Sequence, residues 1–113
     1  MIKVRFYRKP DKGSIHMTLE GHAGAAPKGE DLVCASATML AYTAAQAVKF
    51  LNDTGKLKTK PMIQITEGKA RVIATPTEEA YAETLCAFWT VQCGAHVLAH
   101  NYPQFVELEH LTM

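Results

Sequence analysis

The sequence has no run of 18 or more apolar residues, so it offers no candidate for a membrane-spanning helix. Its first residues, MIKVRFYRKP, alternate apolar with charged side chains and lack the continuous apolar segment of a secretory signal peptide. We therefore expect a soluble, intracellular protein of the cytoplasm that has no membrane partner.

Cysteine is scarce, and its spacing is not that of a paired motif. The chain has three cysteines, Cys34, Cys86 and Cys93. This odd number lacks the C-x-x-C spacing of zinc ribbons and thioredoxin-like redox sites. We therefore expect free thiols in a reducing compartment. Cys86 lies within an apolar stripe and is expected to be a small buried residue.

Lysine and arginine are absent after Arg71. Residues 1–71 hold all twelve basic residues and six acidic ones, whereas residues 72–113 hold five acidic residues. This asymmetry would give the molecule a dipolar surface unless folding mixes the two halves. The net charge of +1 and the isoelectric point near 7.8 give no reason to expect direct nucleic-acid binding.

What is present favours an α+β fold in one domain over residues 1–113. At 48% hydrophobic content, a chain of 113 residues can bury a single core. Apolar and polar side chains alternate in five segments, which predicts strands at residues 2–7, 17–22, 62–66, 69–75 and 105–110. Apolar residues three and four apart predict two helices, from Leu32 to about Leu51 and from Pro76 to about His100. The order ββαββαβ predicts one antiparallel or mixed sheet with two helices packed on it.

The predicted helices have recognisable ends. Asp31 is the natural N-cap of the first helix, because its carboxylate accepts hydrogen bonds from free N–H groups of the first turn. Gly55 stops that helix. TPTE, at residues 75–78, matches a capping box with proline in the first position of the second helix. The apolar stripe of this second helix favours packing in the core, with a dimer interface as the alternative; it consists of Tyr81, Leu85, Phe88 and Trp89.

One histidine and one cysteine flank a small loop. His22 closes a predicted strand, and Cys34 lies twelve positions later in the first turn of a predicted helix. Unpaired N–H groups and the helix dipole favour a thiolate there, which is the nucleophilic form of cysteine. The N–H groups of this turn, including that of Cys34, are also candidate donors to the oxyanion of a tetrahedral intermediate. A catalytic Cys-His dyad is one interpretation.

The other interpretation is purely structural. A cysteine at the start of a buried helix is commonly a small core residue, and a histidine beside a glycine turn is commonly a hydrogen-bonded surface residue. The residues alone leave both interpretations open.

GHAG followed by GEDLVCA resembles the signature of the ribosomal-processing cysteine proteases, the Prp family. The matching positions are Gly21, His22, Ala23, Gly29, Asp31, Leu32, Val33, Cys34, Ala35 and Thr38. The resemblance implies that Cys34 is the nucleophile and that His22 is its acid/base partner. It also implies a homodimer in the bacterial cytoplasm, whose substrate is the N-terminal extension of a large-subunit ribosomal protein. We expect no cofactor and no metal.

The remaining residues of the motif are expected to support the dyad. Asp31 caps and orients the helix rather than completing a triad, and Thr38 either helps to hold the site or bonds back to its own helix. A mobile loop over residues 23–30, with Gly24, Pro27 and Gly29, is expected to order when the correct peptide binds. Ala25 stands where many relatives carry an aromatic residue; this leaves the dyad intact, but the motif does not predict the contacts of the loop with substrate.

Two rival hypotheses use other features. Cys93, His96 and His100 lie at i, i+3 and i+7 and form the best metal-ligand pattern in the chain, although histidines near a helix end commonly interact with terminal carbonyls. The acidic residues 72–113 instead favour a non-catalytic ribosome-assembly partner that binds a basic peptide tail, with strong dependence on salt.

Overall fold

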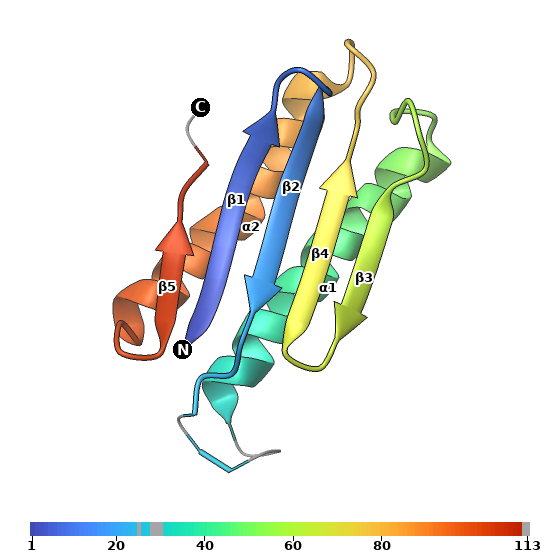
Figure 1. The fold of residues 1–113 in the computed structure, drawn as a ribbon. Coiled ribbons are helices and arrows are strands. Elements are labelled where there is room, and N and C mark those ends of the chain that lie inside the picture. Colours follow the sequence, from blue (N-terminus) through green and yellow to red (C-terminus); the bar gives the residue numbers. More distant parts are fainter. Residues whose placement is uncertain (25, 28–30, 112–113) are drawn as a thin grey trace.

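The computed structural model describes residues 1–24, 26–27 and 31–111, which form one five-stranded sheet with both helices on the same face (Figure 1). The predicted order ββαββαβ and the α+β class are confirmed. The elements are β1 (Ile2–Lys9), β2 (Ser14–Glu20), α1 (Leu32–Asp53), β3 (Met62–Thr66), β4 (Lys69–Ala74), α2 (Tyr81–Asn101) and β5 (Val106–Glu109).

The sheet is mixed and has the strand order β3-β4-β2-β1-β5. Both hairpins, β1–β2 and β3–β4, are antiparallel as predicted, and β2 pairs antiparallel with β4. The last strand, β5, pairs parallel with β1, and Val4 lies opposite Leu108. The first and last segments of the chain therefore lie side by side at one edge of the sheet.

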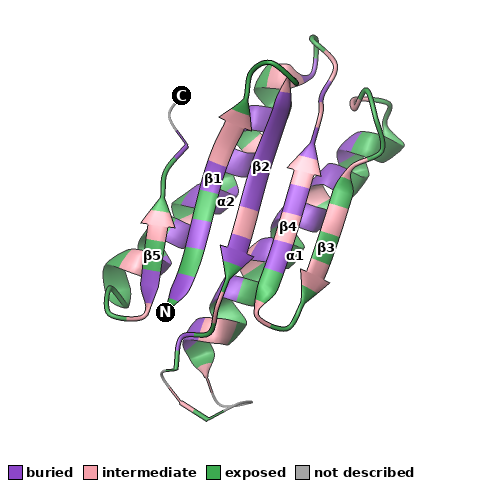
Figure 2. Cartoon of the chain, viewed as in Figure 1, coloured by how far each residue is buried: buried purple, intermediate pink, exposed green. Residues whose placement is uncertain are grey.

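The core lies between the sheet and the two helices. Buried and exposed residues alternate along the first half of β1, as the period of two predicts (Figure 2). The largest fully buried side chains include Phe6, Ile15, Met17, Val48, Val72 and Phe88. Helix α1 faces the sheet with small residues, among them Ala37, Ala41 and Ala44, so its axis lies close to the strands.

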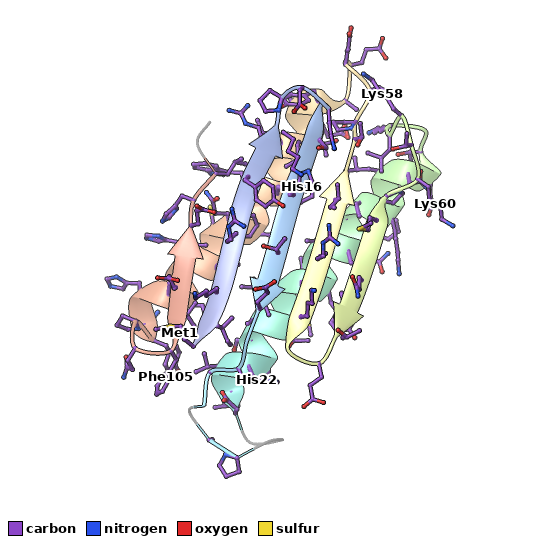
Figure 3. All side chains as sticks on the ribbon, in the orientation of Figure 1. Met1, His16, His22, Lys58, Lys60 and Phe105 are labelled. Carbon is purple, nitrogen blue, oxygen red and sulfur yellow. The ribbon has the colours of Figure 1, made fainter. Side chains whose placement is uncertain are left out.

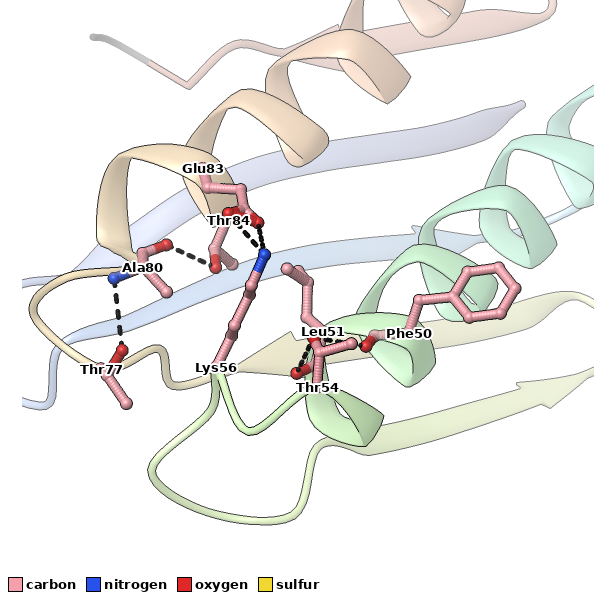
Figure 4. Close-up of polar contacts among 8 residues, drawn as sticks. All are labelled: Phe50, Leu51, Thr54, Lys56, Thr77, Ala80, Glu83 and Thr84. Carbon is pink, nitrogen blue, oxygen red and sulfur yellow. Dashed lines mark hydrogen bonds and ion pairs between the residues drawn. The ribbon is translucent and has the colours of Figure 1, made fainter.

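Helix α1 begins where the sequence predicts and ends two residues later than predicted. The Asp31 carboxylate accepts a hydrogen bond from the Cys34 N–H at 3.0 Å, which confirms the N-cap. At the other end, the Thr54 hydroxyl donates to the carbonyl oxygen of Phe50 at 2.9 Å (Figure 4). Gly55 follows with a φ of +74°, a conformation that glycine adopts readily, and the helix stops.

The predicted start of α2 is wrong. The helix begins at Tyr81 rather than Pro76. Residues 75–77 of the expected capping box pair with another segment instead: Thr75 accepts a backbone hydrogen bond from Lys58, and Thr77 donates one to Lys56. The Thr77 hydroxyl then accepts a hydrogen bond from Ala80 N–H at 3.2 Å in the turn before the helix (Figure 4). Pairing with a distant segment has overridden a local capping signal.

The apolar stripe of α2 is only partly core. Leu85 and Phe88 are buried, whereas Tyr81 is half-buried and the Trp89 side chain is 37% exposed. Cys86 is exposed, so the prediction that it is a buried residue is wrong. It lies one residue from the buried Leu85, and a rotation of about 100° per residue is enough to carry a side chain off the buried face of a helix.

Candidate active site

Cys34 lies in the first turn of α1, at a helix end whose geometry is set by Asp31. The thiol is half-buried and free. Its own N–H donates to the Asp31 carboxylate, so this N–H is already used and is not a free oxyanion donor, contrary to the expectation from sequence. Asp31 serves as the cap that was predicted, since its carboxylate accepts from the backbone of this turn.

A backbone N–H group from another segment donates to the sulfur. The N–H of Ala23 donates to Cys34 Sγ at 3.2 Å. The segment just after β2 therefore contacts the thiol directly, and this contact places the residue after His22 at the start of α1. Sequence reasoning did not find this role for Ala23, because it is made by the backbone.

His22 is held by its own backbone and by two glycines. Its carbonyl oxygen accepts a hydrogen bond from the Met1 nitrogen at 2.7 Å, and both residues lie at the same end of the sheet (Figure 3). Gly21 has a φ of +98°, and a Cβ there would collide with the carbonyl oxygen of Met1. A Cβ built on Gly68 would lie 2.7 Å from His22 Nε2, so the imidazole ring rests on the turn between β3 and β4.

His22 and Cys34 line the same cleft, which has a volume of about 710 Å³. Within the described residues, no hydrogen bond joins the imidazole ring to the thiol. The ring is exposed and the thiol is half-buried, so both face the same open space. The structure thus brings the two residues to one cleft.

Other predicted residues lie at or near this cleft. Thr38 lines it and is exposed, and in the described part of the chain its hydroxyl makes no hydrogen bond, whereas Ser36 and Thr43 on the same helix bond back to carbonyls four residues earlier. Of the predicted loop, Gly24 has a φ of +70° and Pro27 is exposed, and Gly29 lies outside the described residues.

Among the cleft residues that the sequence analysis missed are Met39 and Tyr42 on α1 and Ile65 on β3. The sequence indicates these residues only weakly. Beside its buried stripe, α1 carries large apolar residues at positions that the helical period leaves exposed, and Met39 is 64% and Tyr42 54% exposed.

The predicted metal ligands Cys93, His96 and His100 do not line this cleft. Among the residues that the structure describes, no group of three or more His, Cys, Asp or Glu side chains is placed to hold a metal ion. The ring of His96 lies 5.5 Å from that of His110, centroid to centroid.

In the described segments, neither helix is both long and apolar enough to cross a bilayer.

His16 has a pKa well below its ordinary value. Burial, followed by the nearby charges of Lys9, Arg71 and Lys12, lowers the pKa of His16 to about 4. Its Nε2 is 2.7 Å from the Ser14 hydroxyl, and its ring stacks on Tyr7 with centroids 4.6 Å apart. His16 lies near the start of β2, whereas His22 follows the end of that strand (Figure 3). His16 therefore belongs to the structure of the sheet rather than to the cleft.

A half-buried thiol at the start of a helix, with a backbone donor on its sulfur and an imidazole on the same cleft, is the arrangement of a cysteine hydrolase. Comparison with known proteins makes this class more specific. A family profile described as "Cysteine protease Prp" matches residues 1–107. The chain belongs to the Prp family of cysteine proteases.

Relatives agree with this assignment. The "Ribosomal processing cysteine protease Prp" of Bacillus subtilis (strain 168) is 42% identical over 48 residues, which are 42% of this chain and 43% of that protein. The aligned region thus spans less than half of the relative.

Solved structures extend the likeness to the whole fold. An essential ribosomal processing protease Prp from S. aureus, in complex with a covalently linked product peptide, matches with a TM-score of 0.74 at 20% identity, over 99% of this chain and all of that one. A protein from Streptococcus mutans matches with a TM-score of 0.68 at 27% identity, over 100% of this chain and 96% of that one.

Proposed function

We propose that this chain is a cysteine endopeptidase that removes the N-terminal extension of a large-subunit ribosomal protein, as a single domain spanning residues 1–113. The observation that carries the proposal is the shared cleft of Cys34 and His22, with the Ala23 N–H donating to the sulfur. The name of the B. subtilis relative and the product peptide in the S. aureus structure support the substrate class.

The proposed chemistry is acyl transfer through a thioester. His22 accepts the proton of the Cys34 thiol, and the thiolate attacks the carbonyl carbon of the peptide bond. The tetrahedral intermediate collapses as the imidazolium protonates the leaving amine. Water then attacks the thioester carbon and gives up a proton to His22. The carbon–sulfur bond breaks, the new carboxyl terminus is released, and His22 returns the proton to the sulfur of Cys34. Asp31 positions Cys34 by fixing the first helical turn, and Thr38 lies beside the reacting groups.

Because no hydrogen bond joins the His22 ring to the Cys34 thiol in the described part of the chain, we infer that peptide binding completes the site. The predicted loop at residues 23–30 is proposed to order around the correct peptide, and its first residue already contacts the thiol through Ala23 N–H. Hydrogen exchange of this loop checks the idea, because protection that is the same with and without peptide would count against it.

The proposed setting is the cytoplasm, with a homodimer as the working form and without a direct nucleic-acid partner, cofactor or metal. Large apolar side chains exposed on both helices, such as Phe50 on α1 and Val97 on α2, support self-association. Light scattering coupled to size-exclusion chromatography measures the mass directly, and a mass of one chain at working concentration would contradict the dimer.

The test of the function is cleavage of the ribosomal protein that carries its extension, followed by intact mass. Wild type is expected to remove one discrete segment, and Cys34→Ala to remove none, because the nucleophile is lost. Cys86→Ala is the matched control, since it deletes an exposed thiol elsewhere and should cleave like wild type. Cleavage by Cys34→Ala at the wild-type rate would disprove the nucleophile. A folded, reduced wild type that binds the peptide without cleaving it would support the non-catalytic binding partner.

A further inference from the structure

The backbone N–H groups next to the thiol on α1 already have partners. Attack of a thiol on a peptide carbonyl forms a tetrahedral intermediate, whose negatively charged oxygen needs donors about 2.7–3.1 Å away. The N–H of Cys34 donates to the Asp31 carboxylate at 3.0 Å, and that of Ala35 donates to the Asp31 carbonyl oxygen at 3.1 Å. These two N–H groups are therefore not available to the oxygen.

The side chains of the cleft offer few further donors. Among the described residues that line it there is no Asn, Gln, Lys, Arg, Ser or Trp. Apart from the His22 ring, its nitrogen and oxygen donors are the hydroxyls of Thr38, Tyr42 and Thr66. Of these, Thr38 lies about one helical turn after Cys34 and Tyr42 about two turns after it. Thr38 is therefore the side-chain alternative to a donor from the backbone.

The N–H of Ala23 is a backbone donor that already contacts the nucleophile, since it donates to Cys34 Sγ at 3.2 Å. Ala23 is 6% exposed and packs in the hydrophobic core, so its backbone is held by the body of the protein. A donor that is fixed before the reaction needs no reorganisation when charge develops beside it.

We propose that the Ala23 N–H is a donor to the oxyanion, which makes the backbone of residue 23 part of the catalytic machinery. This inference rests on the proposed endopeptidase function and adds a catalytic group to it. When Cys34 Sγ attacks the carbonyl carbon, a carbon–sulfur bond forms and the π electrons of the carbonyl move onto its oxygen. The negative charge thus leaves the sulfur and appears two bonds away, and the N–H donates to the oxygen instead. When the carbonyl re-forms, the carbon–nitrogen bond breaks and the His22 imidazolium protonates the leaving amine.

Replacing Ala23 by lactic acid tests the proposal, because the amide becomes an ester that lacks the N–H and keeps the methyl group. The same replacement at Ala80 is the matched control. Ala80 is 5% exposed, its N–H donates to Thr77 Oγ1 at 3.2 Å, and it does not line the cleft. The ester at position 23 is expected to lower kcat/KM for cleavage about 100- to 1000-fold, and the ester at position 80 to leave it unchanged.

Alkylation by iodoacetamide separates the oxyanion from the thiol. This reaction displaces iodide from a saturated carbon and forms no oxyanion, so its rate reports the thiol alone. In a Cys86→Ala, Cys93→Ala background, Cys34 is the single cysteine. The ester at position 23 should be alkylated within about threefold of the parent rate although it cleaves far more slowly. Equal losses in both reactions would mean that the N–H acts on the sulfur alone, and would overturn the proposal.

A measurement on the unchanged backbone does not depend on how the ester folds. A peptide aldehyde that ends at the residue before the cleaved bond forms a tetrahedral adduct with the Cys34 thiol. The NMR signal of the Ala23 amide proton is expected to move downfield in this adduct, and an unmoved signal would contradict the donor. Loss of cleavage in Thr38→Val with full cleavage by the position-23 ester would assign the oxyanion to Thr38 and keep the protease. A parent that cleaves nothing would remove the protease and the donor together.

Discussion

At the scale of single residues, the position of His22 depends on residues that have no side chain. Gly21 allows the chain to turn out of β2 against Met1, and Gly68 leaves the space in which the imidazole ring lies. These glycines are needed for close approach as well as for backbone conformation, since both also have positive φ. The placement of the proposed acid/base is therefore sensitive to a single methyl group in a different hairpin.

Gly68→Ala is expected to abolish most cleavage by displacing the His22 ring, because the new Cβ would lie 2.7 Å from Nε2. The positive φ of +73° adds a cost of about 1–2 kcal/mol in stability. Gly13→Ala separates the two effects: Gly13 has a φ of +65° in the other hairpin, but a Cβ there meets nothing within 4 Å. Cleavage rates and urea unfolding should show equal losses of stability and a loss of activity in Gly68→Ala alone. Equal activity in the two variants would contradict the role of Gly68.

At the scale of elements, Asp31 caps the N-terminal end of α1, where Cys34 lies. A capping residue and the third member of a triad make different demands, because asparagine caps a helix about as well as aspartate but carries no charge. We expect Asp31→Asn to keep its stability and most of its cleavage rate, and Asp31→Ala to lose about 1 kcal/mol in the free energy of unfolding. Urea unfolding and cleavage kinetics check both values. A large loss of rate in a fully stable Asp31→Asn would show that the charge takes part in catalysis.

The elements that sequence predicts well are those whose signals are local. The cap at Asp31, the stop at Gly55 and the period-two strands need only neighbouring residues. The cap and the stop appear where expected and the strands appear in the predicted order, but β2 runs Ser14–Glu20 and ends before His22, which was predicted to close it. The start of α2 could not be found this way, because Thr75 and Thr77 bond to residues near Lys56 that lie far away in sequence. The candidate site shows the same division. Motif and spacing point to His22 and Cys34, but the contacts of Ala23 N–H and Gly68 depend on how two hairpins and a helix meet.

At the scale of the whole molecule, folding mixes the charges that the sequence keeps apart. The acidic β5 pairs with the basic β1, and Arg5 forms an ion pair with Glu109 at 2.5 Å. Lys56 similarly meets Glu83 across the two halves of the chain (Figure 4). The asymmetry along the sequence is thus partly neutralised in space. Ion pairs this exposed contribute little to stability, so the response of the fold to pH depends on buried groups instead.

The last prediction concerns that response and centres on His16. The unfolded chain binds a proton at His16 near pH 6.5, whereas the folded protein binds it only near pH 4, so the unfolded state holds more protons between these values. Stability from this residue is complete above pH 6.5 and falls toward pH 4, by up to about 1.4 kcal/mol per pH unit. His16→Phe keeps an aromatic ring beside Tyr7 but does not titrate, so its free energy of unfolding should fall less steeply across this window. Urea unfolding from pH 4 to 7.5 compares the two proteins, and carboxylates that titrate in both cancel in the difference. Parallel curves would mean that His16 is protonated as easily in the folded protein as in the unfolded chain. Neither its burial nor the nearby charges of Lys9 and Arg71 would then contribute to the pH dependence of stability.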